Sequence, residues 1–354
     1  MFVEESHMTD PTAYQALALQ MTCPAVNRLS VDDARASMLA TIARAGQLIA
    51  GSRGFLGSFA GSSTQLIVLP EYFMTSFPMG ESIEAWQAKG CVAMDGPEYE
   101  ALGALAQAQK LHLSGNLYEL DPRFPSLYFQ TSFLIGPNGD VLLRYRRLIS
   151  MFAPTPHDVL DEYLDHYGAD ALFPVADTAI GRIACVASEE ILYPELVRAH
   201  ALRGAEIICH SSSEVGSPRA TPKNIAKQAR AYENMVYLVS ANSAGISGIA
   251  FPEASTDGHS QVVDYRGHVL GEASSGESMC GNGEIDIAAL RRTRRKPGMT
   301  NTLARQRLEL FSRVYAGEPV YPANTLLGSV APERAHFQRT LQDTIESLSK
   351  RGII

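Results

Sequence analysis

The sequence has few cysteines and no spacing that would pair them. Only five occur in 354 residues, at Cys23, Cys91, Cys185, Cys209 and Cys280, and none of them forms a CxxC motif. An odd, scattered set argues against a disulfide framework and against a zinc knuckle. The cysteines therefore predict a reduced, cytoplasmic chain.

Long apolar runs and an excess of positive charge are also absent. No stretch of 18 apolar residues occurs, so we expect no membrane span. The start, MFVEESHMTDPTAY, has neither the basic region nor the apolar segment of a secretory signal. A net charge of −8 argues against a protein that binds the nucleic-acid backbone. Nucleotide-binding loops and paired metal-binding histidines are missing too, so we expect no cofactor and no metal.

What the chain does contain is an alternation of short apolar runs and helical patterns. With 45% hydrophobic residues it is long enough to bury a large core. Apolar positions at helical spacing predict a helix over 32–50, with Ser30 as its cap. Strands over 131–136 and 140–146 flank an Asn-Gly turn, which is typical of a hairpin. A turn this short makes the two strands antiparallel, so the pattern predicts a mixed sheet layered with helices.

Most of the remaining pattern predicts further strands and helices. Residues 150–175 read as irregular, and the last three strands read as a meander. The predicted strands lie at 16–21, 65–73, 111–118, 181–187, 206–210, 236–241, 260–265, 268–273 and 283–287, and the predicted helices at 97–109, 194–203 and 221–234.

The domain organisation follows from where the pattern changes. Residues 1–14 predict a loose arm, and 15–296 a single domain. From about 297 the pattern becomes polar helices with apolar positions at helical spacing. We interpret 297–354 as a C-terminal extension that packs on a neighbouring subunit, which predicts a homodimer or a higher homo-oligomer.

Three segments could carry chemistry. Residues 69–73 (LPEYF) place Glu71 after an apolar strand, 139–147 (GDVLLRYRR) end a strand in basic residues, and 181–195 (GRIACVASEEILYPE) run from a strand through a sharp turn into a helix. Each has a structural alternative when taken alone. The acid can lie in a solvated turn, the basic strand end can face solvent, and the serine of the third segment can cap a helix.

Taken together, these segments resemble the nitrilase superfamily of carbon–nitrogen hydrolases. That family carries a Glu after a strand, a Lys after a Tyr-Arg pair, and a Cys at an elbow before an aromatic-Pro-Glu sequence. Further matching stretches are Arg203–Glu206, Arg230–Asn234, Ser240–Asn242, Ser260–Asp264 and Glu284–Ile287, so the resemblance covers about 15–295. It implies an α/β fold, a four-layer α-β-β-α sandwich with mixed sheets.

Two of the three residues at the expected catalytic positions differ from the family pattern. Counting forward from Gly181 and back from Tyr193 gives the same nucleophile position, and Ser188 stands there in place of Cys. Counting from Gly139 gives Arg147 in place of Lys. Glu71 keeps its expected place. The resemblance therefore implies an atypical site made of Glu71, Arg147 and Ser188.

Four further residues have assignments of their own. Glu162 could be the second glutamate that many members of the family carry, or an exposed loop acid. Tyr72 and His210 are expected to contact substrate, although a hydrogen-bonded structural role fits His210 equally well. Cys185 lies three residues before Ser188, which places it on the opposite face of the strand as a small core residue.

The resemblance implies hydrolysis of a small-molecule amide, nitrile or ester through an acyl-enzyme. Three interpretations of the substitutions stay open. Ser188 can be a natural nucleophile that gives weak or altered activity. The chain can be an inactive relative that binds a ligand or scaffolds an oligomer. Ser188 can also have been introduced to trap a substrate complex, which would leave Arg147 unexplained.

Overall fold

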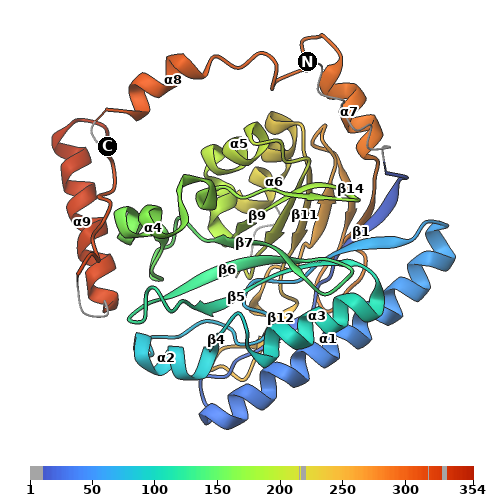
Figure 1. Cartoon of the computed structure of the whole chain (residues 1–354), viewed down its shortest axis with the longest axis horizontal. Coiled ribbons are helices and arrows are strands. Elements are labelled where there is room, and N and C mark those ends of the chain that lie inside the picture. Colours follow the sequence, from blue (N-terminus) through green and yellow to red (C-terminus); the bar gives the residue numbers. More distant parts are fainter. Residues whose placement is uncertain (1–10, 215, 217–220, 318, 329–332) are drawn as a thin grey trace, which may run out of the picture.

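Two facing β-sheets form the centre of the molecule, and helices cover their outer faces (Figure 1). The structure is a computed structural model that describes residues 11–214, 216, 221–317, 319–328 and 333–354. Of the helices in these ranges, none is long and apolar enough to cross a membrane.

The first sheet is mixed. In spatial order it contains β15 (Asn282–Ile285), β1 (Tyr14–Ala18), β3 (Thr64–Val68), β5 (His112–Leu120), β6 (Tyr128–Ile135) and β7 (Val141–Arg146), and β4 (Cys91–Val92) pairs with β5. Strands β1, β3 and β5 are parallel to one another, whereas β6 runs antiparallel to both β5 and β7. Strands β6 and β7 form the predicted antiparallel hairpin, with the Asn-Gly turn between them.

The second sheet repeats this arrangement. Its order is β14 (Val269–Glu272), β13 (Gln261–Val263), β11 (Tyr237–Ala241), β10 (Ile207–Ser211), β9 (Gly181–Ala187) and β8 (Ala176–Thr178). Strands β9, β10 and β11 are parallel, β8 and β13 run antiparallel to them, and β14 runs antiparallel to β13. A separate parallel pair joins β2 (Thr22–Pro24) to β12 (Gly245–Ser247).

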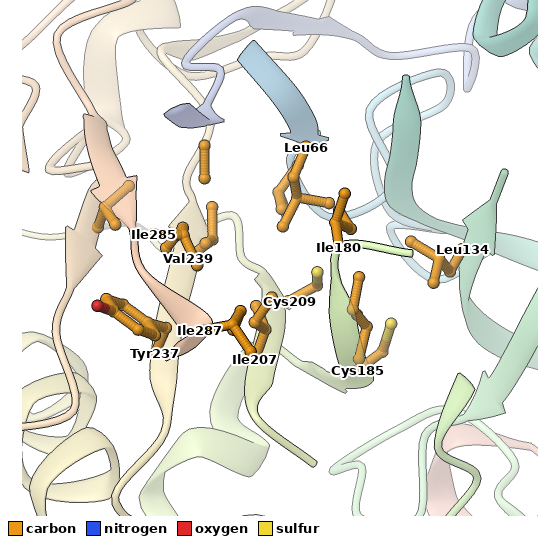
Figure 2. Close-up of a cluster of buried hydrophobic side chains, with 14 of the residues drawn as sticks. Leu66, Leu134, Ile180, Cys185, Ile207, Cys209, Tyr237, Val239, Ile285 and Ile287 are labelled. Carbon is orange, nitrogen blue, oxygen red and sulfur yellow. The ribbon is translucent and has the colours of Figure 1, made fainter. Parts of the chain in front are cut away.

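Alternation along the strands divides the core into layers, because successive side chains point to opposite faces of a sheet. Leu66 of β3 packs between the sheets, while its neighbour Ile67 packs outward. Figure 2 shows the inner layer, where Leu66 and Leu134 of the first sheet lie in one cluster with Cys185 and Cys209 of the second. Cys185 is fully buried there, as predicted.

The outer layers are pairs of helices. Helices α1 (Val31–Ala60) and α3 (Pro97–Gln109) cover the first sheet, and α5 (Pro194–Leu202) and α6 (Pro222–Asn234) cover the second. The side chain of Ser30 accepts a hydrogen bond from the Asp33 N–H and caps α1 as predicted. The structure is therefore the α-β-β-α sandwich with mixed sheets that the sequence predicts.

The prediction of an irregular segment over 150–175 is wrong. This segment contains the 3₁₀ helix η1 (Pro156–Val159), α4 (Leu160–Tyr167) and the 3₁₀ helix η2 (Ala169–Leu172). The Asp158 carboxylate accepts hydrogen bonds from both the backbone N–H and the hydroxyl of Thr155, which starts the first turn. Val159 and Tyr163 lie four residues apart and pack into one apolar cluster, which holds the helical conformation.

Other boundaries also differ from the predictions. The helix predicted over 32–50 continues to Ala60 as α1, and the strand predicted over 65–73 ends at Val68 as β3. The third strand of the predicted meander, β15, leaves the second sheet and pairs with β1 of the first. The segment 273–281 is long enough to carry the chain across, whereas a meander needs tight turns. At the other end, Tyr14 already belongs to β1 and is fully buried. Of the predicted arm 1–14, residues 1–10 lie outside the described residues.

The C-terminal extension runs along the outside of the sandwich. After α7 (Ile287–Arg295), α8 (Leu308–Tyr315) has every side chain exposed. Helix α9 (Arg334–Lys350) lies beside α4 (Figure 1) and contacts it through Phe337, which is buried in one cluster with Tyr163. The short α2 (Ile83–Gly90) and the 3₁₀ helices η3 (Ser188–Leu192) and η4 (Glu253–Ser255) complete the chain.

Candidate active site

Glu71 lies in the segment that follows β3, where the chain turns away from the sheet at Pro70. Its carboxylate is buried and accepts three hydrogen bonds. Oε1 accepts from Gln130 Nε2 at 2.6 Å and from Arg147 Nη1 at 3.2 Å, and Oε2 accepts from the Ser213 N–H at 3.1 Å. Because one donor comes from each of three separate segments, the carboxylate is held in a single orientation.

Arg147 directly follows β7, and its guanidinium is buried between two carboxylates. Nη1 lies 3.2 Å from Glu71 Oε1 and Nη2 lies 2.6 Å from Glu189 Oε1. Nη1 also donates to Gln130 Oε1 at 2.7 Å, and Nε donates to the Ile149 carbonyl at 2.7 Å. Burial alone lowers the pKa of Arg147, but Glu71 and Glu189 outweigh it, so this pKa lies above its ordinary value. The side chain is a permanent cation.

Ser188 forms the elbow between β9 and η3. Its backbone has φ = +52°, the left-handed region that a non-glycine residue rarely adopts, and its side chain is largely buried. Glu190 holds this turn. Its Oε2 accepts from the Ala187 N–H at 2.9 Å, and its Oε1 accepts at 2.7 Å from both the Leu148 N–H and the Tyr145 hydroxyl. Through Glu190, the elbow is joined to the end of β7.

The environment of Glu190 also changes its acidity. Burial raises the pKa of this carboxyl to about 7, while Arg147 and the surrounding hydrogen-bond donors oppose the shift. The Glu190 side chain is fully buried, and its carboxylate is occupied by hydrogen bonds to the elbow and to the end of β7. Its role is therefore to support the elbow.

His210 lies beneath the elbow at the end of β10 and is fully buried. Its Nε2 donates to the Ser188 carbonyl at 2.9 Å, and its Nδ1 accepts from the Ser240 hydroxyl at 2.8 Å. Burial, with a smaller effect of Lys227, places the pKa of His210 well below its ordinary value, so the ring is neutral. Because both ring nitrogens are occupied, the geometry gives His210 a supporting position under Ser188 and leaves no nitrogen for the predicted substrate contact.

A cavity of about 720 Å³ brings the three motif residues together. Glu71, Arg147 and Ser188 all line it, and so does Tyr72, which was predicted to contact substrate. The other lining residues are mixed in character and include five more aromatic side chains, Phe77, Tyr118, Tyr128, Phe152 and Phe337. A cavity of this size can enclose a small organic molecule, since ligand sites commonly measure about 300–1,000 Å³.

Glu162 is not part of this site. It lies on the exposed face of α4, because the residue that α4 buries is its neighbour Tyr163. The second carboxylate that the structure brings to the site is Glu189, directly after Ser188. Sequence reasoning missed Glu189 and also Gln130, which bridges Glu71 and Arg147. A polar residue within the buried strand β6 was the signal for Gln130.

These groups can support a nucleophilic reaction. Ser188 supplies a hydroxyl, Glu71 a carboxylate that can accept a proton, and Arg147 a fixed positive charge, all on one cavity wall. Among the described residues, no three His, Cys, Asp or Glu side chains gather in a way that could hold a metal ion.

Comparison with known proteins gives a consistent result. The family model for carbon-nitrogen hydrolases matches residues 17–295. A probable nitrilase of Schizosaccharomyces pombe is 24% identical over 208 residues, covering 59% of this chain and 70% of that protein. An omega-amidase of Saccharomyces cerevisiae is 23% identical over 254 residues, covering 72% of this chain and 84% of that protein.

Solved structures agree with the fold. A carbon-nitrogen hydrolase from Helicobacter pylori superposes with a TM-score of 0.65 at 21% identity, covering 86% of this chain and 98% of the other. A Saccharomyces cerevisiae member of branch 10 of the nitrilase superfamily gives a TM-score of 0.64 at 20% identity, covering 86% of this chain and 100% of the other. At these identities the structures establish the architecture alone.

Proposed function

Because this chain belongs to the carbon–nitrogen hydrolase family, we propose that it hydrolyses a small-molecule amide or a related ester, with weak or altered activity. Ser188 is the nucleophile, Glu71 the general base, and Arg147 the positive charge beside the reacting carbonyl. The observation that carries this proposal is that these side chains, from three distant motifs, line one cavity.

In the first step, Ser188 Oγ forms a bond to the substrate carbonyl carbon while its proton passes to Glu71. Oε2 of Glu71 has one described donor, the Ser213 N–H, so it keeps a lone pair for this proton. The tetrahedral intermediate then expels the amine, which takes the proton from Glu71, and leaves an ester on Ser188. Water then attacks this ester while Glu71 accepts its proton. The bond between the acyl carbon and Ser188 Oγ breaks, Glu71 returns the proton to Oγ, and the carboxylic acid departs.

Two features of the site limit the rate. A serine hydroxyl is far less acidic than a thiol, whose pKa is about 8.5, so the base must remove more of the proton in the transition state. Arg147 can donate hydrogen bonds to an oxyanion through Nη2, where only Glu189 is a described partner. It cannot release a proton at physiological pH, so it cannot serve as a general acid.

A second candidate function is ligand binding without turnover. The observation that favours it is the position of Arg147 between Glu71 and Glu189, at 3.2 and 2.6 Å. These ion pairs, together with Gln130 and the Ile149 carbonyl, engage most of the guanidinium donors. Glu71, the proposed base, is well ordered by these contacts. Arg147 already partly neutralises its negative charge, however, which makes Glu71 a weaker proton acceptor.

A panel of amides, nitriles and esters tests the two candidates. Ammonia or acid release and the intact mass of the protein are measured after incubation. We expect slow hydrolysis, well below the ~10 s⁻¹ typical of enzymes, and a mass increase on Ser188. Ser188→Ala should abolish both. If Ser188→Ala matches the unaltered protein on every substrate that is cleaved, Ser188 carries no chemistry, and binding without turnover on the same panel favours the second candidate.

Restoring the family residues tests whether the substitutions act together. Ser188→Cys alone should not give a fast enzyme, because Arg147 still occupies the position beside it. Residues that act as a unit are strongly non-additive. Ser188→Cys with Arg147→Lys should therefore raise the rate by more than the product of the two single changes. A double variant that equals that product would argue against a coupled site.

A further inference from the structure

One wall of the active-site cavity comes from the C-terminal extension. Arg334 and Phe337 of α9, with Glu333 just before it, line the same cavity as Glu71 and Ser188. Helix α9 lies well beyond residues 17–295, the part of the chain that matches the family. The cavity is thus shared between the family domain and a segment outside it.

This wall is fixed by contacts within the chain. Phe337 is buried against Phe124, Leu127, Phe129 and Tyr163. Ahead of the helix, the Leu326 N–H donates to the Asp158 carbonyl at 2.9 Å and Thr325 Oγ1 donates to the Asp158 carboxylate at 3.1 Å. His336 Nε2 lies 3.2 Å from Thr325 Oγ1. Helix α9 is therefore packed against α4 through Phe337 and linked to η1 through Thr325.

Aromatic side chains lie on and beside this wall. Arg334 places its guanidinium carbon 4.1 Å from the centre of the Phe152 ring, a cation–π contact, and Phe152 itself lines the cavity. Deeper in, Tyr118 stacks on Tyr72 and meets Tyr128 edge to face. Aromatic side chains thus line the cavity both beside Glu71 and at α9.

Charge does not favour an anionic ligand at the outer end. Arg334 shares this end with two exposed acids, Glu84 and Glu333, so no excess of positive charge is present there. The inner end is occupied by Glu71, Arg147 and Ser188, which the scissile bond must reach. About 720 Å³ is far more than a one- or two-carbon amide can fill.

We propose that α9 is a specificity element, and that the substrate is a carboxamide or ester whose acyl group ends in an aryl ring that lies against Phe152, Phe337 and Arg334. This inference rests on the proposed function for the position of the scissile bond, but it concerns only binding of the distal group. It assigns to the C-terminal extension a role in substrate choice.

The test uses ω-phenylalkanamides of increasing chain length. Arg334→Ala is compared with Arg339→Ala, an exposed arginine of the same helix that does not line the cavity. We expect Arg334→Ala to lower the ratio of kcat/KM for the longest amide to that for the shortest by about fivefold, the size of an exposed cation–π contact. Arg339→Ala should leave this ratio within about twofold.

Direct binding separates this inference from the proposed function. Dissociation constants for the same series are measured by calorimetry or ligand-observed NMR, where no turnover is needed. If no amide is cleaved but Arg334→Ala still weakens the long members selectively, the hydrolase proposal fails and the specificity role stands. If Arg334→Ala changes all chain lengths equally, or if Arg339→Ala has the same effect, the specificity role is overturned. Phe337→Leu, which keeps an apolar side chain, should shift the series in the same direction.

Discussion

At the scale of single residues, Arg147 is the group around which the site is organised. Its three guanidinium nitrogens contact Glu71, Glu189, Gln130 and the Ile149 carbonyl at 2.6–3.2 Å. A planar fork with five N–H donors can serve these partners together. A lysine, with a single nitrogen, cannot reach all four. A lysine at position 147 would thus fit poorly into this particular arrangement.

Arg147→Lys should therefore destabilise the fold. It leaves buried acceptors unpaired, each costing about 1–3 kcal/mol, so we expect the free energy of unfolding to fall by about 3 kcal/mol. Arg144→Lys is the matched control, three residues earlier in β7, because Arg144 contacts only Glu119 among the described ion pairs and is partly exposed. It should cost less than about 1 kcal/mol. Equal losses in urea unfolding would show that the network around Arg147 contributes no special stability.

At the scale of elements, the elbow between β9 and η3 has a strained backbone that neighbouring side chains hold in place. Ser188 has φ = +52°, and the turn is held by Glu190 from within and by His210 from below. A left-handed backbone costs a non-glycine residue roughly 1–2 kcal/mol. Such strain persists only where the surrounding contacts hold it, and it projects the Ser188 side chain toward the cavity that it lines.

Replacing Ser188 by glycine and by alanine separates strain from chemistry. Both variants lack the hydroxyl, but only glycine relieves the backbone. We expect Ser188→Gly to be more stable than Ser188→Ala by about 1 kcal/mol. At Ser58, within helix α1, the order should reverse, because glycine is about 1 kcal/mol worse than alanine in a helix. If glycine is also the less stable variant at position 188, the elbow stores no strain.

At the scale of the whole molecule, buried titratable groups make stability depend on pH. Burial lowers the pKa of His112 to about 4 and that of His200 to about 3, and burial also places the pKa of His210 well below the ordinary 6.5. These three rings are neutral when folded and charged when unfolded below pH 6.5. Glu190 has the opposite effect on proton uptake. Burial raises its pKa from 4.5 to about 7, so between these values it is protonated in the folded chain and ionised in the unfolded chain.

Stability should consequently fall on acidification between pH 6.5 and 4.5. At pH 5.5 the unfolded chain binds three protons at these histidines, while the folded chain binds one at Glu190. The net uptake of two protons on unfolding gives a slope of about 2.7 kcal/mol per pH unit. Urea unfolding at several pH values measures this slope, and His112→Gln should reduce the slope by about half. A flat profile would mean that these histidines are charged in the folded protein.

The extension leaves an apolar surface uncovered. Along α8 the exposed side chains include Leu310, Phe311, Val314 and Tyr315. We expect a second copy of the chain to cover them, so light scattering should give at least twice the 38.4 kDa of one chain. Phe311→Ser with Val314→Ser should lower the mass toward that of a monomer, whereas Arg313→Ser on the same helix should not. A monomer at micromolar concentration would contradict this prediction.

The sequence by itself determined much of the local structure. Helix α3 has the predicted bounds, β9 begins and ends as predicted, and the Asn-Gly turn joins β6 to β7. It also singled out Glu71, Arg147 and Ser188 as candidates, because each follows a strand in a recognisable motif, and the three line one cavity. These features depend on side-chain period, turn chemistry and short-range spacing, all of which are written along the chain. The cytoplasmic location stays a prediction from cysteine usage.

Tertiary structure decided the rest. Glu162 and Glu189 are both acids near a motif, but only Glu189 reaches Arg147, because α4 turns the other outward. His210 supports Ser188 because β9 and β10 pair in register. The cavity wall at α9 joins residues far apart in sequence, held by the burial of Phe337. Contacts of this kind depend on how separate elements pack against one another, and no local pattern specifies that packing.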